Sequence, residues 1–325
     1  MNPYLRSIYQ IFTAGRFANA YKFALARAIV KLSRNLDINQ LFIGKRDLAS
    51  CFLEYYWPLE TTYHIRQEID PNKDPLVMMN LRRLMKEGVV EQGGSLVEFK
   101  KRSLKEYDEL LDVIEKDALD DVVPRFHTVQ SKNVSPMLYR FTGKIGKAGD
   151  GITLSSDAKA ALHDYGQVID YMAIAAWAGF TEHFTTAPRL LEKISGQKPV
   201  RQSLSDWRPA LVEIQRGHCF YCQTRIENQA EVGHVLPWSF VLEDRTWNLV
   251  LACKQCNAAK GDCLSDSPML HQLLARNDLI TELELTVGEK FLRHFEDWKT
   301  RNLSGHVLAL YDQAQQDGFP TWMST

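Results

Sequence analysis

The sequence predicts an α+β protein that is mainly α-helical. Several segments repeat apolar residues at the spacing of three to four that is typical of one helix face. Short β-branched runs occur only between these segments, and two Cys-x-x-C pairs enclose some of them near the C-terminus. At 325 residues the chain is long enough for two or three domains.

The composition indicates a soluble globular protein without a strong overall charge. Hydrophobic residues make up 45% and charged residues 24%, which provides enough apolar material for real cores. The formal net charge is −1, so any attraction to nucleic acid has to come from local patches. Basic residues interrupt each apolar stretch near the N-terminus, and no run of about 18 apolar residues occurs. We therefore expect no signal peptide, no membrane span and a cytoplasmic location.

Residues 1–100 predict a winged-helix-like domain. Helices are expected over Tyr21–Leu32, Leu48–Tyr56 and Pro75–Lys86, followed by two short strands in Val89–Phe99 that meet at Gly93-Gly94. The first helix is expected to have a basic outer face, because basic residues dominate residues 1–46: Arg6, Arg16, Lys22, Arg27, Lys31, Arg34, Lys45 and Arg46. Two interpretations of this basic face stay open: it is exposed to solvent, or it contacts phosphates. Three stay open for the domain as a whole, because winged-helix-like units bind DNA, bind proteins or only pack internally.

Residues 101–206 predict a helical and mixed connecting domain. An acidic helix is expected over residues 104–121 and a long helix over Ser156–Phe180, with strands and loops between them. Four glycines punctuate residues 124–155, but no Gly-Lys-Ser/Thr follows, so they do not indicate a phosphate-binding loop. Pro188–Asp206 is expected to be a linker to the last part of the chain, residues 207–325.

The two Cys-x-x-C pairs are the most specific feature of the sequence. They are Cys219-Phe-Tyr-Cys222 and Cys253-Lys-Gln-Cys256, with thirty residues between them. Four thiolates close a tetrahedral shell around Zn²⁺, which leaves no position for a substrate and so indicates a structural zinc site. Two such pairs alone indicate only a zinc module, and many zinc modules bind partners without catalysis.

The residues between and after the cysteine pairs indicate more than a zinc module. His234 follows a β-prone run, Asn248 begins a second one, and Asn257 and Lys260 lie in an expected helix. The order is therefore strand, strand and helix, with polar residues at the end or start of each element.

With these residues in this order, Gly217–Leu264 resembles the HNH nuclease family and its ββα-metal fold. The resemblance implies that the chain cuts phosphodiester bonds in DNA, with His234 as general base. It implies that Asn248 orients the loop and the histidine, and that Asn257 binds a catalytic Mg²⁺ or Mn²⁺. Lys260 either contacts a phosphate or is a solvated helix residue.

Two further strings refine the resemblance. Pro237-Trp-Ser and Trp247-Asn-Leu-Val-Leu are similar to HNH proteins of bacterial anti-phage defence, among which the nuclease component of Zorya-type systems is one candidate. A regulatory defence-system protein is therefore an expected partner besides DNA.

One position departs from the family pattern. Many family members carry Asp or His immediately before the catalytic histidine as a metal ligand, whereas this chain has Gly233. Residues two apart on a strand share a face, so Glu231 is the first candidate for the missing ligand, and Asp262 is the second.

The sequence leaves three functions open. The first is a metal-dependent DNA endonuclease or nickase, the second a non-catalytic zinc-stapled DNA-binding or adaptor protein, and the third an RNase. After Asp262 we expect a C-terminal helical arm that carries an aromatic stripe: Phe291, His294, Phe295 and Trp298.

Overall fold

The chain forms two compact units. The computed structural model describes residues 1–37, 39–70, 72–197, 203–226, 230–280, 295, 298 and 301–324. The first unit contains Met1–Thr185 and Leu190–Gln197, and the second contains Thr186–Arg189 and Lys198–Thr325. The protein is mainly helical with small sheets, as predicted. The division into three domains stays a prediction.

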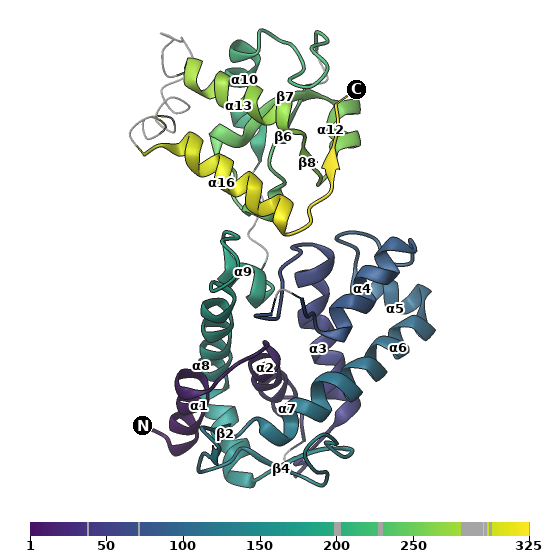
Figure 1. Cartoon of the computed structure of the whole chain (residues 1–325), viewed down its shortest axis with the longest axis vertical. Helices are drawn as coiled ribbons and strands as arrows, with labels where there is room; N and C mark the ends of the chain where they lie inside the picture. Colours follow the sequence, from purple (N-terminus) through teal and green to yellow (C-terminus); the bar gives the residue numbers. More distant parts are fainter. Residues whose placement is uncertain are drawn as a thin grey trace. The chain divides into compact units, whose positions relative to one another are not determined.

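The first unit is a helical assembly with a small sheet (Figure 1). Its strands β1, β5 and β4 form a three-stranded antiparallel sheet in the order β1-β5-β4, and β2 pairs with β3. The elements are α1 (Pro3–Ala14), α2 (Tyr21–Ser33), β1 (Phe42–Gly44), α3 (Lys45–Thr61), α4 (Leu76–Lys86), α5 (Leu96–Arg102), α6 (Leu104–Ile114), the π-helical turn η1 (Glu115–Leu119), α7 (Asp120–Arg125), β2 (Thr128–Val129), β3 (Lys132–Asn133), β4 (Tyr139–Phe141), β5 (Gly151–Leu154), α8 (Ser156–Thr181) and α9 (Leu190–Ser195).

Helix α2 lies at the centre of the first unit. It packs against α3 and along the 26-residue helix α8, and nearly all its side chains are buried. Small residues permit this close packing: a Cβ added at Gly166 of α8 would lie 3.2 Å from Val30 of α2. Both helices were predicted from their apolar spacing, and both are confirmed.

The expected basic outer face of α2 is wrong at Arg27. Its guanidinium is buried, bonds to Asp170 at 2.9 Å and donates to the backbone carbonyls of Ile194 and Ser195. Because α2 is surrounded by other helices, the Arg27 guanidinium bonds to groups inside the unit and is not available to a phosphate. Contact of the remaining basic residues with DNA stays a prediction.

The predicted hairpin over Val89–Phe99 is also wrong. Residues 89–94 form turns, and Leu96–Arg102 form α5. The Ser95 side chain caps this helix by accepting from the amide of Glu98, which matches the Ser-x-x-Glu pattern of a capping box. The strand interpretation followed the β-prone residues on both sides of Gly93-Gly94 and overlooked this helix-start pattern. The predicted winged-helix-like domain therefore lacks the β-hairpin that would form its wing, and this interpretation is unconfirmed.

The second unit contains the cysteine motifs. Strands β6 and β7 form an antiparallel pair, whereas β8 and β9 pair in parallel, so the end of the described chain lies beside β8. Of the predicted aromatic stripe, Phe295 and Trp298 are buried, and Phe291 and His294 lie outside the described residues. The elements are η2 (Leu204–Trp207), α10 (Arg208–Ile214), β6 (Ala230–His234), α11 (Trp238–Val241), η3 (Thr246–Asn248), β7 (Leu249–Cys253), α12 (Lys254–Lys260), β8 (Leu264–Ser265), α13 (Ser267–Ile280), α16 (Leu303–Gln316) and β9 (Thr321–Trp322).

The helices also bear on the predicted absence of a membrane span. Within the described parts of both units, none is long and apolar enough to cross a bilayer.

The buried position of Arg27 yields a stability prediction. Arg27→Ala removes one charged and two carbonyl hydrogen bonds from the contact of α2 with α8 and α9. We expect a loss of about 2–3 kcal/mol in the free energy of unfolding of the first unit, measured by chemical denaturation. Arg34→Ala, at the exposed end of the same helix, is the control and is expected to change this energy by less than about 0.5 kcal/mol. Equal effects of the two variants would contradict the structural role of Arg27.

Candidate active site and metal centre

The site is built on β6, β7 and α12, in the predicted order of strand, strand and helix. The register pairs Glu231 with Ala252, Gly233 with Val250 and His234 with Leu249. All of β7 except Cys253 is buried, because its apolar run packs within the unit on both faces. Helix α12 packs against both strands, so residues of α12 face the strand that carries Glu231 and Gly233.

A side chain covers the other edge of β7. Gln215 accepts from the Leu251 amide at 2.7 Å and donates to the Leu251 carbonyl at 2.9 Å, as a neighbouring strand would. The amide of Phe220, inside the first cysteine motif, also donates to the Leu251 carbonyl at 2.9 Å. These bonds attach the first Cys-x-x-C loop to the strand that ends in the second. Gln215 was not singled out in the sequence, because an isolated glutamine has no distinctive pattern.

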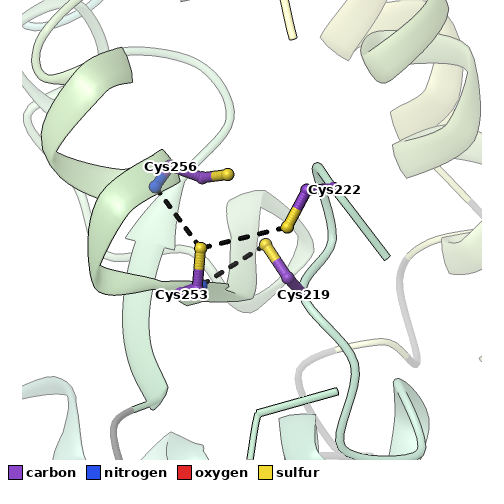
Figure 2. A group of neighbouring side chains, drawn as sticks. All are labelled: Cys219, Cys222, Cys253 and Cys256. Carbon is purple, nitrogen blue, oxygen red and sulfur yellow. Dashed lines mark hydrogen bonds between the residues drawn. The ribbon is translucent and has the colours of Figure 1, made fainter. Parts of the chain in front are cut away.

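The four predicted cysteines converge, as Figure 2 shows. Their Sγ atoms all lie within 4.8 Å of one another, and the Sγ atoms of Cys222 and Cys253 are 3.9 Å apart. A tetrahedral zinc with bonds of about 2.3 Å to sulfur requires sulfur atoms about 3.8 Å apart. The side chains therefore fit a zinc ion with little movement.

Backbone amides orient the thiols of this cluster. The Cys253 amide donates to Cys219 Sγ at 3.3 Å, and the Cys256 amide donates to Cys253 Sγ at 3.4 Å (Figure 2). Cys253 is also the N-cap of α12, so one side chain joins the end of β7, the start of α12 and the metal centre. Amide donors favour the thiolate form that binds a metal.

Asn257 and Glu231 lie in contact beside Gly233. The Asn257 Nδ2 donates to Glu231 Oε2 at 2.8 Å, which fixes the orientation of the amide. A Cβ added at Gly233 would lie only 2.4 Å from Asn257 Oδ1. Asn257 Oδ1 can therefore occupy this position because residue 233 has no side chain. The glycine that departs from the family pattern thus permits the close approach of Asn257 to β6. An aspartate at position 233 would require Asn257 to move.

Asn248 holds the segment that follows β6. Its side chain is fully buried, accepts from the Leu236 amide at 2.8 Å and donates to the Leu236 carbonyl at 3.0 Å. Its own carbonyl accepts from the Val235 amide at 3.0 Å. Three bonds therefore fix the chain one and two residues after His234, which is the arrangement that an orienting role requires.

His234 ends β6, and its only described polar partner is Asp244. Its Nε2 lies 2.9 Å from Asp244 Oδ1, and the two side chains are 12% and 16% exposed. Asp244 was not among the residues singled out in the sequence. It lies ten positions after the histidine in a loop between two other charged residues, so only the fold reveals the contact.

Lys260 and Asp262 contact backbone groups near the end of α12. Lys260 is 2% exposed, so the solvated alternative is wrong, and its Nζ donates to the Cys263 carbonyl at 2.8 Å. Burial lowers the pKa of Lys260 to about 8, partly offset by Asp262 and Cys263. Asp262 accepts from the Ser239 amide at 3.5 Å. Of the two candidates for the missing ligand, Glu231 is therefore the one that contacts Asn257.

Helix α13 supports the start of β7 from the other side. The half-buried Arg276 donates to the carbonyls of Leu249, at 2.6 Å, and Trp247, at 3.2 Å. Burial lowers the pKa of Arg276 to about 9. Asn277 donates to the Trp247 carbonyl as well, at 2.9 Å. The backbone on both sides of Asn248 is thus held in place.

A ββα unit with a four-cysteine centre and an ordered His, Asn and Asn defines the class of this site. Residues 219–265 match the family described as HNH endonuclease, and the match begins and ends with the elements just described. No curated protein and no solved structure matches the chain. The second unit therefore contains a segment that matches the HNH endonuclease family, which confirms the predicted HNH resemblance over residues 219–265. The resemblance to anti-phage defence proteins and to Zorya-type nucleases stays a prediction.

The cysteine geometry predicts one tightly bound zinc per chain, measurable by elemental analysis of the purified protein. Cys222→Ser and Cys253→Ser should each lose the metal and unfold the second unit, because the ion joins β7, α12 and the first cysteine loop. Cys263→Ser is the matched control, since this thiol lies in the same unit but outside the cluster. Wild-type protein that contains no metal would contradict the assignment.

Proposed function

We propose that this chain is a metal-dependent DNA endonuclease or nickase whose HNH domain hydrolyses phosphodiester bonds. One observation carries the proposal: in a domain that matches the HNH endonuclease family, a histidine held by a carboxylate ends β6 while an oriented asparagine oxygen lies against the same strand. The match covers the domain that holds the proposed catalytic residues. DNA as the substrate follows from the family resemblance.

His234 is the proposed general base. A neutral imidazole accepts a proton from water near pH 7, and the resulting hydroxide attacks the phosphorus as the bond to the leaving oxygen breaks. Asn248 is the proposed positioning residue, since its bonds to Leu236 and Val235 fix the chain that follows the base.

Asn257 and Glu231 are the proposed residues that hold the catalytic cation. A carbonyl oxygen and a carboxylate are hard donors of the kind that Mg²⁺ and Mn²⁺ prefer. The two side chains are in contact through Asn257 Nδ2 and Glu231 Oε2, and Asn257 Oδ1 lies against Gly233. A bound divalent cation would stabilise negative charge on the phosphate and on the leaving oxygen. Glu231 also orients the Asn257 amide, which directs its Oδ1 away from the Nδ2–carboxylate contact.

Lys260 is better explained as a structural residue than as a phosphate ligand. A phosphate contact would require its ammonium to leave the Cys263 carbonyl and the buried position after α12. We assign Lys260 to the connection between α12 and β8. The proposal also includes a role in anti-phage defence, which rests on the resemblance of two short strings to defence-system HNH proteins. A regulatory partner is part of it because an uncontrolled nuclease would damage its host.

Gly233 favours a second candidate function, a zinc-stapled DNA-binding or adaptor protein without catalysis. Among the described residues, the four cysteines form the one group of three or more His, Cys, Asp or Glu side chains placed to hold a metal. The catalytic cation would thus have few protein ligands. The experiments below separate this function from nuclease activity.

The first test is cleavage of supercoiled plasmid and labelled RNA by the purified protein with Mg²⁺, Mn²⁺ or EDTA. We expect metal-dependent nicking or cutting of DNA, and a decrease of about 10²–10⁴-fold in His234→Ala, the typical range for general-base catalysis. His271→Ala is the control, because His271 is an exposed histidine of α13 that bonds only within its own helix. Cleavage of RNA alone would make the protein an RNase. Bound but uncut DNA would favour the adaptor function.

The second test separates the two roles of Glu231. Glu231→Gln keeps an oxygen that accepts from Asn257 but removes the charge, whereas Glu231→Ala removes both. If the carboxylate binds the cation, Gln should raise the Mg²⁺ concentration needed for half-maximal cutting by about tenfold or more, because an anionic ligand is lost. If Glu231→Gln needs the same Mg²⁺ concentration as the wild type while Glu231→Ala cuts more slowly, Glu231 does not bind the cation. Its role is then only to orient Asn257.

A further inference from the structure

The loop between α11 and η3 places a carboxylate against the proposed general base. Helix α11 ends at Val241, and the C-cap residue Leu242, with a φ of +51°, turns the chain back while its amide donates to the Trp238 carbonyl at 2.7 Å. Glu243 anchors the turn through an ion pair with Arg189 at 2.9 Å, and the Asn248 amide bonds to the Arg245 carbonyl at 2.8 Å. Asp244 lies between these fixed points, so its position beside His234 is built into the loop.

The contact determines which nitrogen of the imidazole carries the proton. A neutral imidazole has one N–H donor and one acceptor nitrogen, while a carboxylate only accepts. Nε2 must therefore donate to Asp244 Oδ1, which leaves Nδ1 unprotonated and able to accept. We propose that Asp244 is a positioning residue that holds neutral His234 in the Nε2–H tautomer and so makes Nδ1 the base.

This proposal rests on the proposed function and adds a second role during the reaction. When water gives its proton to Nδ1, both ring nitrogens carry protons and the ring becomes a cation, while the hydroxide forms its bond to phosphorus. The Asp244 carboxylate then faces the new positive charge at 2.9 Å. Because both side chains are mostly buried, this interaction is less screened than it would be in water.

The tautomer can be measured directly, without cutting DNA. Protein labelled with ¹⁵N-histidine is studied by NMR at a pH where the imidazole is neutral, and comparison with His234→Gln identifies the His234 signals. We expect the proton on Nε2 in the wild type. In Asp244→Asn the Nε2–H share should fall, because an amide can also donate to Nε2 and so favours the other tautomer. A proton on Nδ1 in the wild type would overturn the proposal.

Cleavage kinetics give the second measurement. Asp244→Asn should lower kcat by about 10–10⁴-fold with KM nearly unchanged, because loss of the carboxylate that holds a base histidine in one tautomer costs up to about 10⁴-fold in kcat. Asp244→Glu keeps a carboxylate and should restore part of kcat. Asp312→Asn is the matched control, because it makes the same substitution at an exposed position of α16 in the second unit, away from His234 and from the loop that carries Asp244.

The two measurements separate this proposal from the nuclease proposal. Asp244→Asn with wild-type kcat, or with a loss that Asp312→Asn reproduces, would overturn the role of Asp244 even if the wild type cuts DNA. If the wild type cuts nothing, the nuclease proposal fails, and the NMR result still supports or overturns the Asp244–His234 geometry. Zinc content and the unfolding midpoint of each variant are measured to confirm that the second unit is folded.

Discussion

The convergence of four cysteine thiols is the constraint on which the site depends. Cys219 and Cys222 come from the loop after α10, Cys253 ends β7 and Cys256 lies in the first turn of α12. Without a link between them, a two-stranded sheet and a seven-residue helix would bury too little apolar surface to hold their positions. A metal bound by these thiols fixes α12 relative to β6, and this relation sets the distance between Asn257 and Glu231. A metal at this centre would therefore act on the proposed active site through geometry.

Gly233 shows how one missing side chain changes the chemistry open to a site. The backbone of β6 approaches Asn257 Oδ1 so closely that a Cβ would lie 2.4 Å away. The usual carboxylate and the observed asparagine position therefore exclude each other unless the helix side chain moves. Glu231 has the longer side chain and reaches Asn257 from two residues earlier on the same strand face. Gly233 leaves space for Asn257, and Glu231 bonds to Asn257 in that position. The departure from the family pattern and the contact with Glu231 therefore belong to the same packing arrangement.

The first unit shows where patterns in the sequence were sufficient and where they were not. Apolar spacing predicted α2 and α8, because a helix that buries one face against a core needs that spacing. The same spacing did not reveal that α2 is buried all round, so Arg27 was assigned to an outer face although it bonds to Asp170 and two carbonyls. The segment after Gly94 contains β-prone residues but begins with a Ser-x-x-Glu sequence whose serine caps a helix, and the helix forms. Burial and capping depend on neighbours that short-range periodicity does not contain.

The sequence by itself determined the mainly helical class, the four cysteine ligands and the strand-strand-helix order that carries His234, Asn248 and Asn257. These features depend on ligand spacing and local conformational preference, which are properties of contiguous residues. Only the tertiary structure decided that Asp244 faces His234, that Asn257 occupies the space above Gly233 and that Lys260 is buried against Cys263. Each of these contacts depends on the turn of a loop or the closeness of a helix to a strand. Such distances are set by the packing of the whole unit, so no short stretch of sequence specifies them.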